Sequence, residues 1–304
     1  MSQTLHILNG DATRPEFERS AIAGDIMIWR EILVEGPALY PLLTDKWFEA
    51  RQNFLNEAYK PDDLTQVNGM RREFEKLLDL SDYDEIVLWF EYDLFCQINM
   101  IAALSALKGR FEGKISLVCP VDHPEIADFR GLGQLSAVHF GPLFAERLAL
   151  SSEDLAFADS AYLTYAAQDP RELSNLIEQA FPEAFPSLKA ALQLHLKRFP
   201  DLNNGLSLEE REMLAILGEG LPSRLKWVGQ ILRQNHQRGF GDSQYFNRIK
   251  RLQPLIVETD ESVRLSEQGQ EVLAGKAKFE AAAVWIGGAH SNEWAWQEGE
   301  LVPQ

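Results

Sequence analysis

Residues 85–97, EIVLWFEYDLFCQ, decide the fold class. The first six form a near-continuous apolar run, which is typical of a strand covered on both faces, as in a parallel sheet. Residues 93–107 continue with a helical pattern, and residues 114–119 (KISLVC) form a second apolar run that Pro120 ends. Strand, helix and strand in this order indicate parallel strands joined by right-handed crossovers.

The same alternation extends toward the N-terminus. Residues 5–8 (LHIL) and 25–29 (DIMIW) are apolar runs of strand length, whereas residues 45–59 and 65–80 carry apolar side chains at helical spacing. Alternating strands and helices predict one α/β domain over residues 1–150, with a mainly parallel, Rossmann-like sheet.

The remaining chain predicts a different organisation. Residues 151–203 have helical patterns and end in the turn-rich stretch PDLNNG, so we expect a helical connector there. Residues 204–304 predict helices, two short strands and a tail, in the order of a winged-helix-like domain. The expected helices cover 207–217, 226–233, 242–252 and 266–273, and the expected strands cover 254–257 and 263–265.

Charge limits the partners of the chain. It has 46 acidic and 29 basic residues, a formal net charge of −17. A molecule this acidic repels nucleic acid and anionic membranes as a whole. Residues 221–251, however, contain seven basic residues and one acidic residue. This segment is therefore the one part of the chain whose charge is compatible with binding nucleic acid.

The helix expected over residues 242–252 would provide the DNA contacts if it is a recognition helix. The alternative is a winged helix that serves packing, dimerisation or contacts with another protein. The residues expected to face a major groove are Gln244, Tyr245, Asn247, Arg248, Lys250 and Arg251.

Cysteine use and hydropathy indicate the compartment. Cys96 and Cys119 are the two cysteines, and neither lies in a CxxC pair, which fits a reducing environment. The N-terminal stretch lacks the pattern of a signal peptide, and no apolar run approaches the roughly 18 residues of a membrane helix. We therefore expect a cytoplasmic protein without a membrane partner.

Polar residues follow the first expected strand. Asn9, Gly10 and Asp11 would lie at the carboxyl end of the sheet, where open α/β domains bind ligands. Glycine lets the backbone approach a ligand closely, so we expect all three residues to bind one. The alternative is an ordinary turn in which Asp11 or Thr13 caps a helix.

A second polar group follows the strand 25–29. Arg30 can clamp an anionic group with its planar guanidinium. Glu31 is a catalytic candidate for proton transfer, and Glu35 is a further candidate for ligand binding. The alternative is an Arg–Glu ion pair at the end of a strand.

A third group follows the strand 85–90. Glu91 and Asp93 precede a helix, and Gln97 lies one turn beyond Asp93. We expect Glu91 and Gln97 to bind the ligand and Asp93 to be catalytic. Together with Asp11, these two carboxylates also form a candidate metal site for Mg²⁺. The alternative is that Asp93 only caps its helix.

Several well-known signatures are missing from the sequence. It contains no GxxxxGK[ST] phosphate loop, no GxSxG elbow and no HExxH zinc motif. His123 follows a strand and is either a base or, more commonly for a loop histidine, a surface residue. The sequence therefore leaves the reaction open.

Three blocks in order resemble the signature of a bacterial family catalogued as "domain of unknown function 1835". They are HILNGD (6–11), WREILVEGP (29–37) and LWFEYDLFCQ (88–97), and the resemblance covers approximately residues 5–125. The stretches PDLNNGLSLEERE (200–212) and WIGGAH (285–290) resemble the region that often accompanies this domain.

The resemblance implies an N-terminal α/β domain but no reaction. This chain departs from the family pattern at Tyr92, where relatives often have His, and at Cys96, where they often have Asp. An activity that depends on either position would be altered here. The implied polar signature is Asn9, Asp11, Arg30, Glu31, Glu35, Glu91, Asp93 and Gln97.

Three functions compete at this point. The first is a domain that binds a small polar, nucleotide-like or phosphorylated molecule, with or without metal-assisted chemistry. The second is a regulator that senses a ligand and binds DNA through its winged helix. The third is a protein-interaction module. The sequence does not decide whether the chain is an enzyme or what its oligomeric state is.

Overall fold

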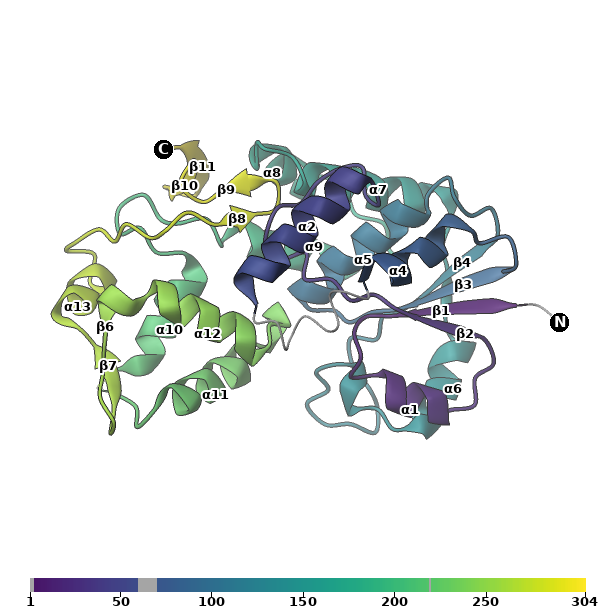
Figure 1. Cartoon of the computed structure of the whole chain (residues 1–304), viewed down its shortest axis with the longest axis horizontal. Helices are drawn as coiled ribbons and strands as arrows, with labels where there is room; N and C mark the ends of the chain where they lie inside the picture. The colour runs from purple at the N-terminus through teal and green to yellow at the C-terminus, as the bar shows by residue number, and fades with distance from the viewer. Residues whose placement is uncertain (1–2, 60–69, 219) are drawn as a thin grey trace.

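The computed structural model describes residues 3–59, 70–218 and 220–304 (Figure 1). Its central sheet has the strand order β2-β1-β3-β4-β5. The first four of these strands run parallel, and β5 pairs antiparallel with β4. The prediction of a mainly parallel α/β sheet is confirmed. The strands are β1 (Thr4–Leu8), β2 (Asp25–Ile28), β3 (Glu85–Trp89), β4 (Lys114–Val118) and β5 (Leu148–Ala149).

Both faces of the sheet are covered, which explains the apolar runs in its strands. On β3, Val87 and Trp89 join a core with the short helices α1 and α6, whereas Ile86 and Leu88 join the larger core on the other face. Figure 1 shows α1 and α6 on one side of the sheet and the remaining helices of this domain on the other. The helices and 3₁₀ turns are α1 (Arg14–Arg19), α2 (Asp45–Ala58), α4 (Met70–Phe74), η2 (Glu75–Leu78), α5 (Leu94–Leu107), η3 (Leu132–Gln134) and α6 (Ala137–Ala145).

The helical connector packs on the sheet domain. It contains α7 (Ser152–Tyr165), α8 (Arg171–Ile177) and α9 (Leu188–Leu196). Both α7 and α9 lie against α5, so α5 is buried on nearly all sides. The expected helix of residues 65–80 is observed from residue 70 onward as α4 and η2, and its earlier part lies outside the described residues.

The C-terminal domain begins at a capped helix. Ser207 accepts from the Glu210 amide, and the Glu210 carboxylate accepts from the Ser207 amide, as the sequence SLEE predicts. Leu221 forms an isolated bridge with Val263 on β7. The elements are α10 (Leu208–Leu217), α11 (Arg224–Gln234), η4 (His236–Arg238), α12 (Asp242–Arg251), η5 (Gln253–Leu255), β6 (Ile256–Glu258), β7 (Val263–Leu265) and α13 (Glu267–Leu273).

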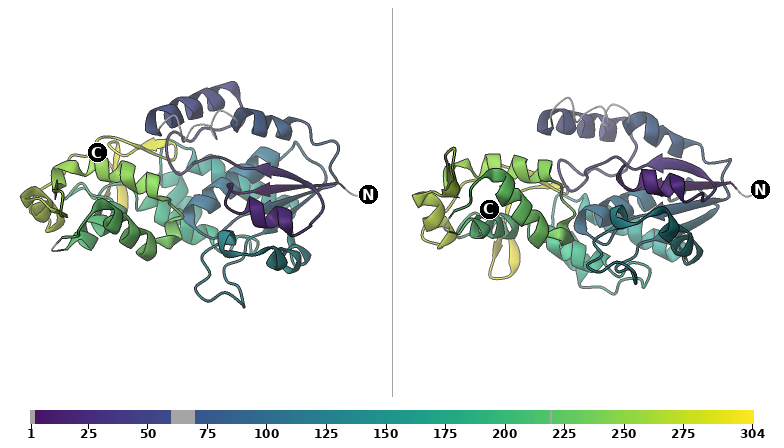
Figure 2. Two further views of the ribbon diagram at one scale, coloured as in Figure 1. Left: turned by 60° about the horizontal axis from the view of Figure 1, so that its bottom comes forward. Right: turned by 90° about the horizontal axis from the view of Figure 1, so that it is seen from below.

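The tail returns to the N-terminal domain and the connector (Figure 2). Ala38 donates a backbone hydrogen bond to the Gly287 carbonyl at 3.0 Å, and Gly288 donates to the Tyr165 carbonyl at 3.1 Å. A Cβ atom on Gly288 would lie 2.0 Å from the Ala166 carbonyl oxygen, so the close contact requires glycine. The tail strands are β8 (Trp285–Ile286), β9 (Ala289–His290), β10 (Trp294–Gln297) and β11 (Glu300–Pro303).

Among the described residues, no helix is both long enough and apolar enough to cross a bilayer.

Candidate functional site

The loops after β1 and β3 bring several predicted residues together. These strands are parallel neighbours, so Asn9 and Glu91 emerge at the same edge of the sheet. The Asn9 amide nitrogen lies 2.8 Å from Cys96 Sγ, and Cys96 donates to Glu91 Oε2 at 3.2 Å. Asn99 on α5 donates to Asn9 Oδ1 at 3.0 Å. Asn9 and Glu91 thus meet around the Cys96 thiol.

Asp93 begins α5 and is enclosed. Its Oδ1 accepts from the Cys96 amide at 2.8 Å, which is the capping role named as the alternative above. The Gly239 backbone, just before α12, lies so close that a Cβ atom there would be 2.1 Å from Asp93 Oδ1. Burial and the nearby charge of Glu91 raise the pKa of Asp93 to about 7. Asp93 is 5% exposed and caps α5, and the catalytic role expected for it stays a prediction.

Glu91, Asp93 and Cys96 form the group that could hold a metal ion. One donor atom of each residue lies within 4.8 Å of the others. Burial raises the pKa of Glu91 as well. A thiol with two carboxylates suits Zn²⁺ better than Mg²⁺, which prefers oxygen donors throughout. Of the expected set of Asp11, Glu91 and Asp93, the two residues after β3 belong to this group and Asp11 does not.

Asp11 is held by Arg30 instead. Arg30 donates from Nε and Nη2 to the two carboxylate oxygens of Asp11 at 2.8 and 2.7 Å. Its Nη1 lies 4.0 Å from Glu73 Oε2. The guanidinium and the carboxylate of this bidentate ion pair, both expected to bind a ligand, therefore bind each other. Gly10 has a φ of +87°, and a Cβ atom there would meet nothing within 4 Å. The positive φ favours glycine at this turn, and the ligand-binding role expected for Gly10 stays a prediction.

Glu31, the catalytic candidate for proton transfer, lies in a buried ion pair. Its side chain is fully buried, and Oε1 accepts from Arg51 at 2.6 Å and from the Ile32 amide at 2.7 Å. Arg51, on α2, is also fully buried. This is the Arg–Glu ion pair that was named as the alternative, with Arg51 in place of Arg30 as the partner, and the catalytic role of Glu31 stays a prediction.

The loop after β2 is buried, and its carbonyl groups need donors because water cannot reach them. Side chains from several helices supply these donors. Arg51 binds the Ile32 and Glu35 carbonyls at 2.9 and 2.6 Å. Tyr165 on α7 donates to the Leu33 carbonyl at 2.7 Å. Much of the block WREILVEGP therefore builds an irregular loop that connects the sheet to the helices.

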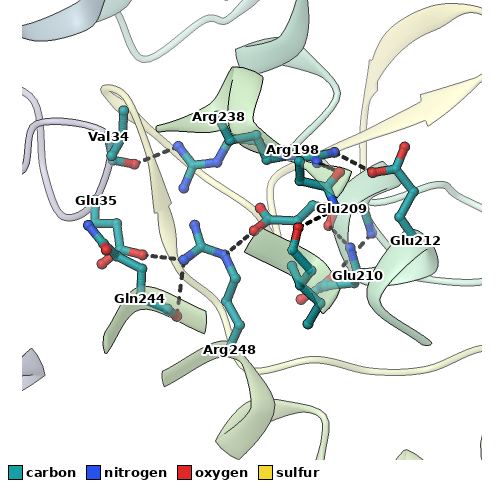
Figure 3. Close-up of polar contacts among 12 residues, drawn as sticks. Val34, Glu35, Arg198, Glu209, Glu210, Glu212, Arg238, Gln244 and Arg248 are labelled. Carbon is teal, nitrogen blue, oxygen red and sulfur yellow. Dashed lines mark hydrogen bonds and ion pairs between the residues drawn. The ribbon is translucent and has the colours of Figure 1, made fainter. Parts of the chain in front are cut away.

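Glu35 ends this loop and faces the C-terminal domain (Figure 3). Its Oε1 accepts from Arg248 at 2.6 Å, and its Oε2 accepts from the Tyr59 hydroxyl at 2.5 Å. Arg248 Nε pairs with Glu209 at 2.8 Å. Burial alone would raise the pKa of Glu35, but Arg248 and Tyr59 hold it below its ordinary value. Glu35 thus connects the loop after β2 to α12 and, through Arg248, to α10.

The same contacts correct the placement expected for α12. Gln244 and Arg248 are each 5% exposed, and Tyr245 is 1% exposed, so they do not face a DNA groove in this arrangement. Asn247 donates to the Ala58 carbonyl on α2 at 3.0 Å. Arg251 pairs with Glu210 at 2.7 Å, and Lys250 is exposed. The basic helix is turned toward its own N-terminal domain.

Two other predicted residues have local roles. Gln97 is buried, and its Nε2 donates to the Glu91 carbonyl at 2.8 Å, so it fixes the turn between β3 and α5. His123 lies in a surface loop beside His139, at 4.7 Å between ring centroids.

A cavity of about 750 Å³ lies where the loop after β2, α2, α12 and the tail meet. Of the predicted ligand-binding residues, Glu35 lines it. Its wall combines charged, amide and aromatic side chains. The lining residues include Glu35, Gly36, Pro37, Ala50, Asn53, Phe54, Arg198, Arg248, Trp285 and His290.

Two arginines that contribute to this region were not predicted from the sequence. Arg51 lies on the same helical face as Trp47 and Leu55, and a basic residue on an apolar face signals a buried ion pair. Arg198 follows α9 near the chain's turn-rich linker, and no local pattern distinguishes it from an exposed arginine.

No protein-family model matches this chain, and no curated protein matches it. The resemblance to the family "domain of unknown function 1835" therefore stays a prediction.

Proposed function

We propose that this chain binds a small polar organic molecule in the cavity between its two domains. The cavity of about 750 Å³ carries this proposal. Its volume falls within the range of small-molecule sites, which commonly lie between domains. It also lies beside a loop at the carboxyl end of a parallel sheet, where α/β domains bind their ligands.

The chemistry of the wall supports a ligand that is both polar and partly apolar. Phe54 and Trp285 offer aromatic surface, while Arg198, Arg248 and Asn53 offer hydrogen-bond donors. Binding sites typically combine apolar walls with a few polar groups that orient the ligand. Such a wall does not specify the reaction, and the proposal is one of binding.

The resemblance noted in the sequence points to the same place. The block WREILVEGP contributes Glu35, Gly36 and Pro37 to the cavity, and the block WIGGAH contributes Trp285 and His290. These blocks are about 250 residues apart along the chain, and they meet at this one site. A signature that is shared for binding would gather in this way.

We further infer that the C-terminal domain is winged-helix-like. Three helices, α10 to α12, precede the hairpin β6–β7, and Leu221 bridges to Val263 as a third short strand would. Because α12 lies against the chain's own α/β domain, this arrangement favours ligand binding over DNA binding.

A cavity-filling variant tests the proposal. We expect ligand-observed NMR with a diverse fragment library to find binders of the wild-type protein. Ala50 lines the cavity from α2, so Ala50→Trp should fill it and abolish the binding of those fragments. Ala156→Trp is the matched control, because Ala156 is exposed on α7 and does not line the cavity.

Two results would contradict the proposal. One is that no fragment binds the wild-type protein. The other is that Ala50→Trp, with an unchanged circular dichroism spectrum, binds the fragments as well as Ala156→Trp does.

A further inference from the structure

We infer that the ligand of this cavity is an organic anion whose carboxylate or phosphate group binds Arg198. This inference rests on the proposed function and names the chemical class of the ligand.

Arg198 is a buried arginine with unused donors. It is 8% exposed, and its Nη1 donates one hydrogen bond, to the Val34 carbonyl at 2.5 Å. A guanidinium has five N–H donors, and a buried one is usually paired with an acid. Within residues 3–59, 70–218 and 220–304, no carboxylate oxygen lies within 4.0 Å of Arg198, although the side chain lines the cavity.

The nearest acids are already engaged. Arg248 binds Glu35 at 2.6 Å and Glu209 at 2.8 Å, so both carboxylates have a closer cation. Arg198 lines the cavity of about 750 Å³ and also a smaller one of about 270 Å³. The larger cavity falls within the volume range of small-molecule sites, and an anion bound there would supply the missing partner.

Two cations lie on one aromatic ring beside the cavity. The Arg198 guanidinium carbon lies 5.6 Å from the Phe240 ring centroid, and that of Arg248 lies 4.5 Å from it. Burial and the charge of Arg248 lower the pKa of Arg198. An anion at this point would lower the repulsion between the two guanidinium groups.

The charge of the whole lining agrees with this assignment. Four arginine and lysine side chains and three glutamates line the cavity, in a chain whose net charge is −17. The cavity is therefore positive relative to its surroundings. Phe54 and Trp285 would contact a planar or apolar body attached to the anionic group.

Matched pairs of anionic and neutral ligands test the inference. The probes are benzoate against benzamide and AMP against adenosine, at constant ionic strength. We expect each anion to bind wild-type protein about tenfold or more tightly than its neutral analogue, as charge-assisted hydrogen bonds predict. Arg198→Gln should weaken the binding of the anions by a similar factor and leave the affinity for the neutral ligands unchanged.

Two further variants separate the role of Arg198 from general effects. Arg198→Lys keeps the charge without the planar fork, so its affinity for the anions should fall between those of wild type and Arg198→Gln. Arg233→Gln removes a charge from an exposed position of α11 and should change nothing.

The inference is overturned if benzamide and adenosine bind as tightly as benzoate and AMP, or if a folded Arg198→Gln keeps the wild-type preference. Should Arg198→Gln not fold, the comparison of ligand pairs on wild-type protein and on Arg198→Lys still decides. If neutral molecules bind as tightly as anions and Ala50→Trp blocks them, the proposed function stands and the inference of an anionic ligand is refuted. Failure of every fragment to bind would refute the proposed function itself.

Discussion

At the scale of single residues, Asp93 is the clearest case in which one side chain opposes stability. It keeps a carboxylate in a buried place beside Glu91, whose charge is of the same sign. Natural sequences break local rules of this kind mainly at functional positions. The cap itself does not require the charge, because asparagine caps helices as well as aspartate does.

We therefore expect Asp93→Asn to stabilise the metal-free protein at pH 8. The folded pKa of about 7 lies above the ordinary value of 3.8. Between these values the folded state holds more protons than the unfolded state, so stability falls as the pH rises through this window. The variant should gain ~1–3 kcal/mol in the free energy of unfolding at pH 8 and nothing near pH 4. Urea unfolding with EDTA at both pH values measures this.

An exposed aspartate provides the comparison for Asp93. Hydrogen bonds from Ser81 lower the pKa of Asp79, which is exposed, so Asp79→Asn should not stabilise the protein at pH 8. A loss of stability in Asp93→Asn under EDTA would show that the carboxylate is favourable where it lies. A loss only without EDTA would indicate that the group of Glu91, Asp93 and Cys96 binds a metal ion.

At the scale of elements, α2 and the loop after β2 depend on each other through Arg51. This arginine is the buried partner of Glu31 and also binds three loop carbonyls. Arg51→Met would leave the Glu31 carboxylate buried without its cation, which typically costs ~3–5 kcal/mol of stability.

Denaturant unfolding of single and double variants checks this expectation for Arg51. Glu31→Gln combined with Arg51→Met should recover part of the loss, because the double variant buries no unpaired charge. Arg71→Met breaks an exposed pair with Asp45 and should cost ~0–1 kcal/mol. Equal losses in Arg51→Met and Arg71→Met would show that the buried ion pair does not hold the loop.

The same elements show what the sequence could and could not predict. Apolar runs and helical spacing predicted β1 to β4, α2 and α5, because strand and helix periods are local properties. The meeting of Asn9 and Glu91 followed from parallel strands alone. The partner of Glu31 could not be predicted because it lies on α2, and spacing does not show which helix faces a loop. The short tail hairpins and the enclosure of Asp93 by Gly239 also depend on contacts between distant segments.

At the scale of the whole molecule, charge organises the junction of the two domains. The chain is strongly acidic, yet its basic segment 221–251 lies partly inside, with Arg248 between Glu35 and Glu209. These three residues come from the N-terminal loop, α10 and α12, so the ion pairs fix how the domains meet. Local charge counting suggested a surface for DNA, whereas the fold uses part of this charge internally.

Arg248→Gln should therefore destabilise the junction in a pH-dependent way. In the wild type the lowered pKa of Glu35 adds stability that is present above the ordinary value of 4.5 and is lost as the pH falls below it.

Without Arg248, Glu35 and Glu209 remain as buried carboxylates whose main cation is gone. We expect a loss of ~3–5 kcal/mol at pH 7, which shrinks toward pH 4 as Glu35 is protonated. Arg251→Gln, which breaks the more exposed pair with Glu210, should cost less at every pH. Thermal unfolding of both variants between pH 4 and pH 8 distinguishes them. A loss in Arg248→Gln that does not vary with pH would mean that packing of the buried Arg248 side chain, rather than its ion pairs, holds these elements together.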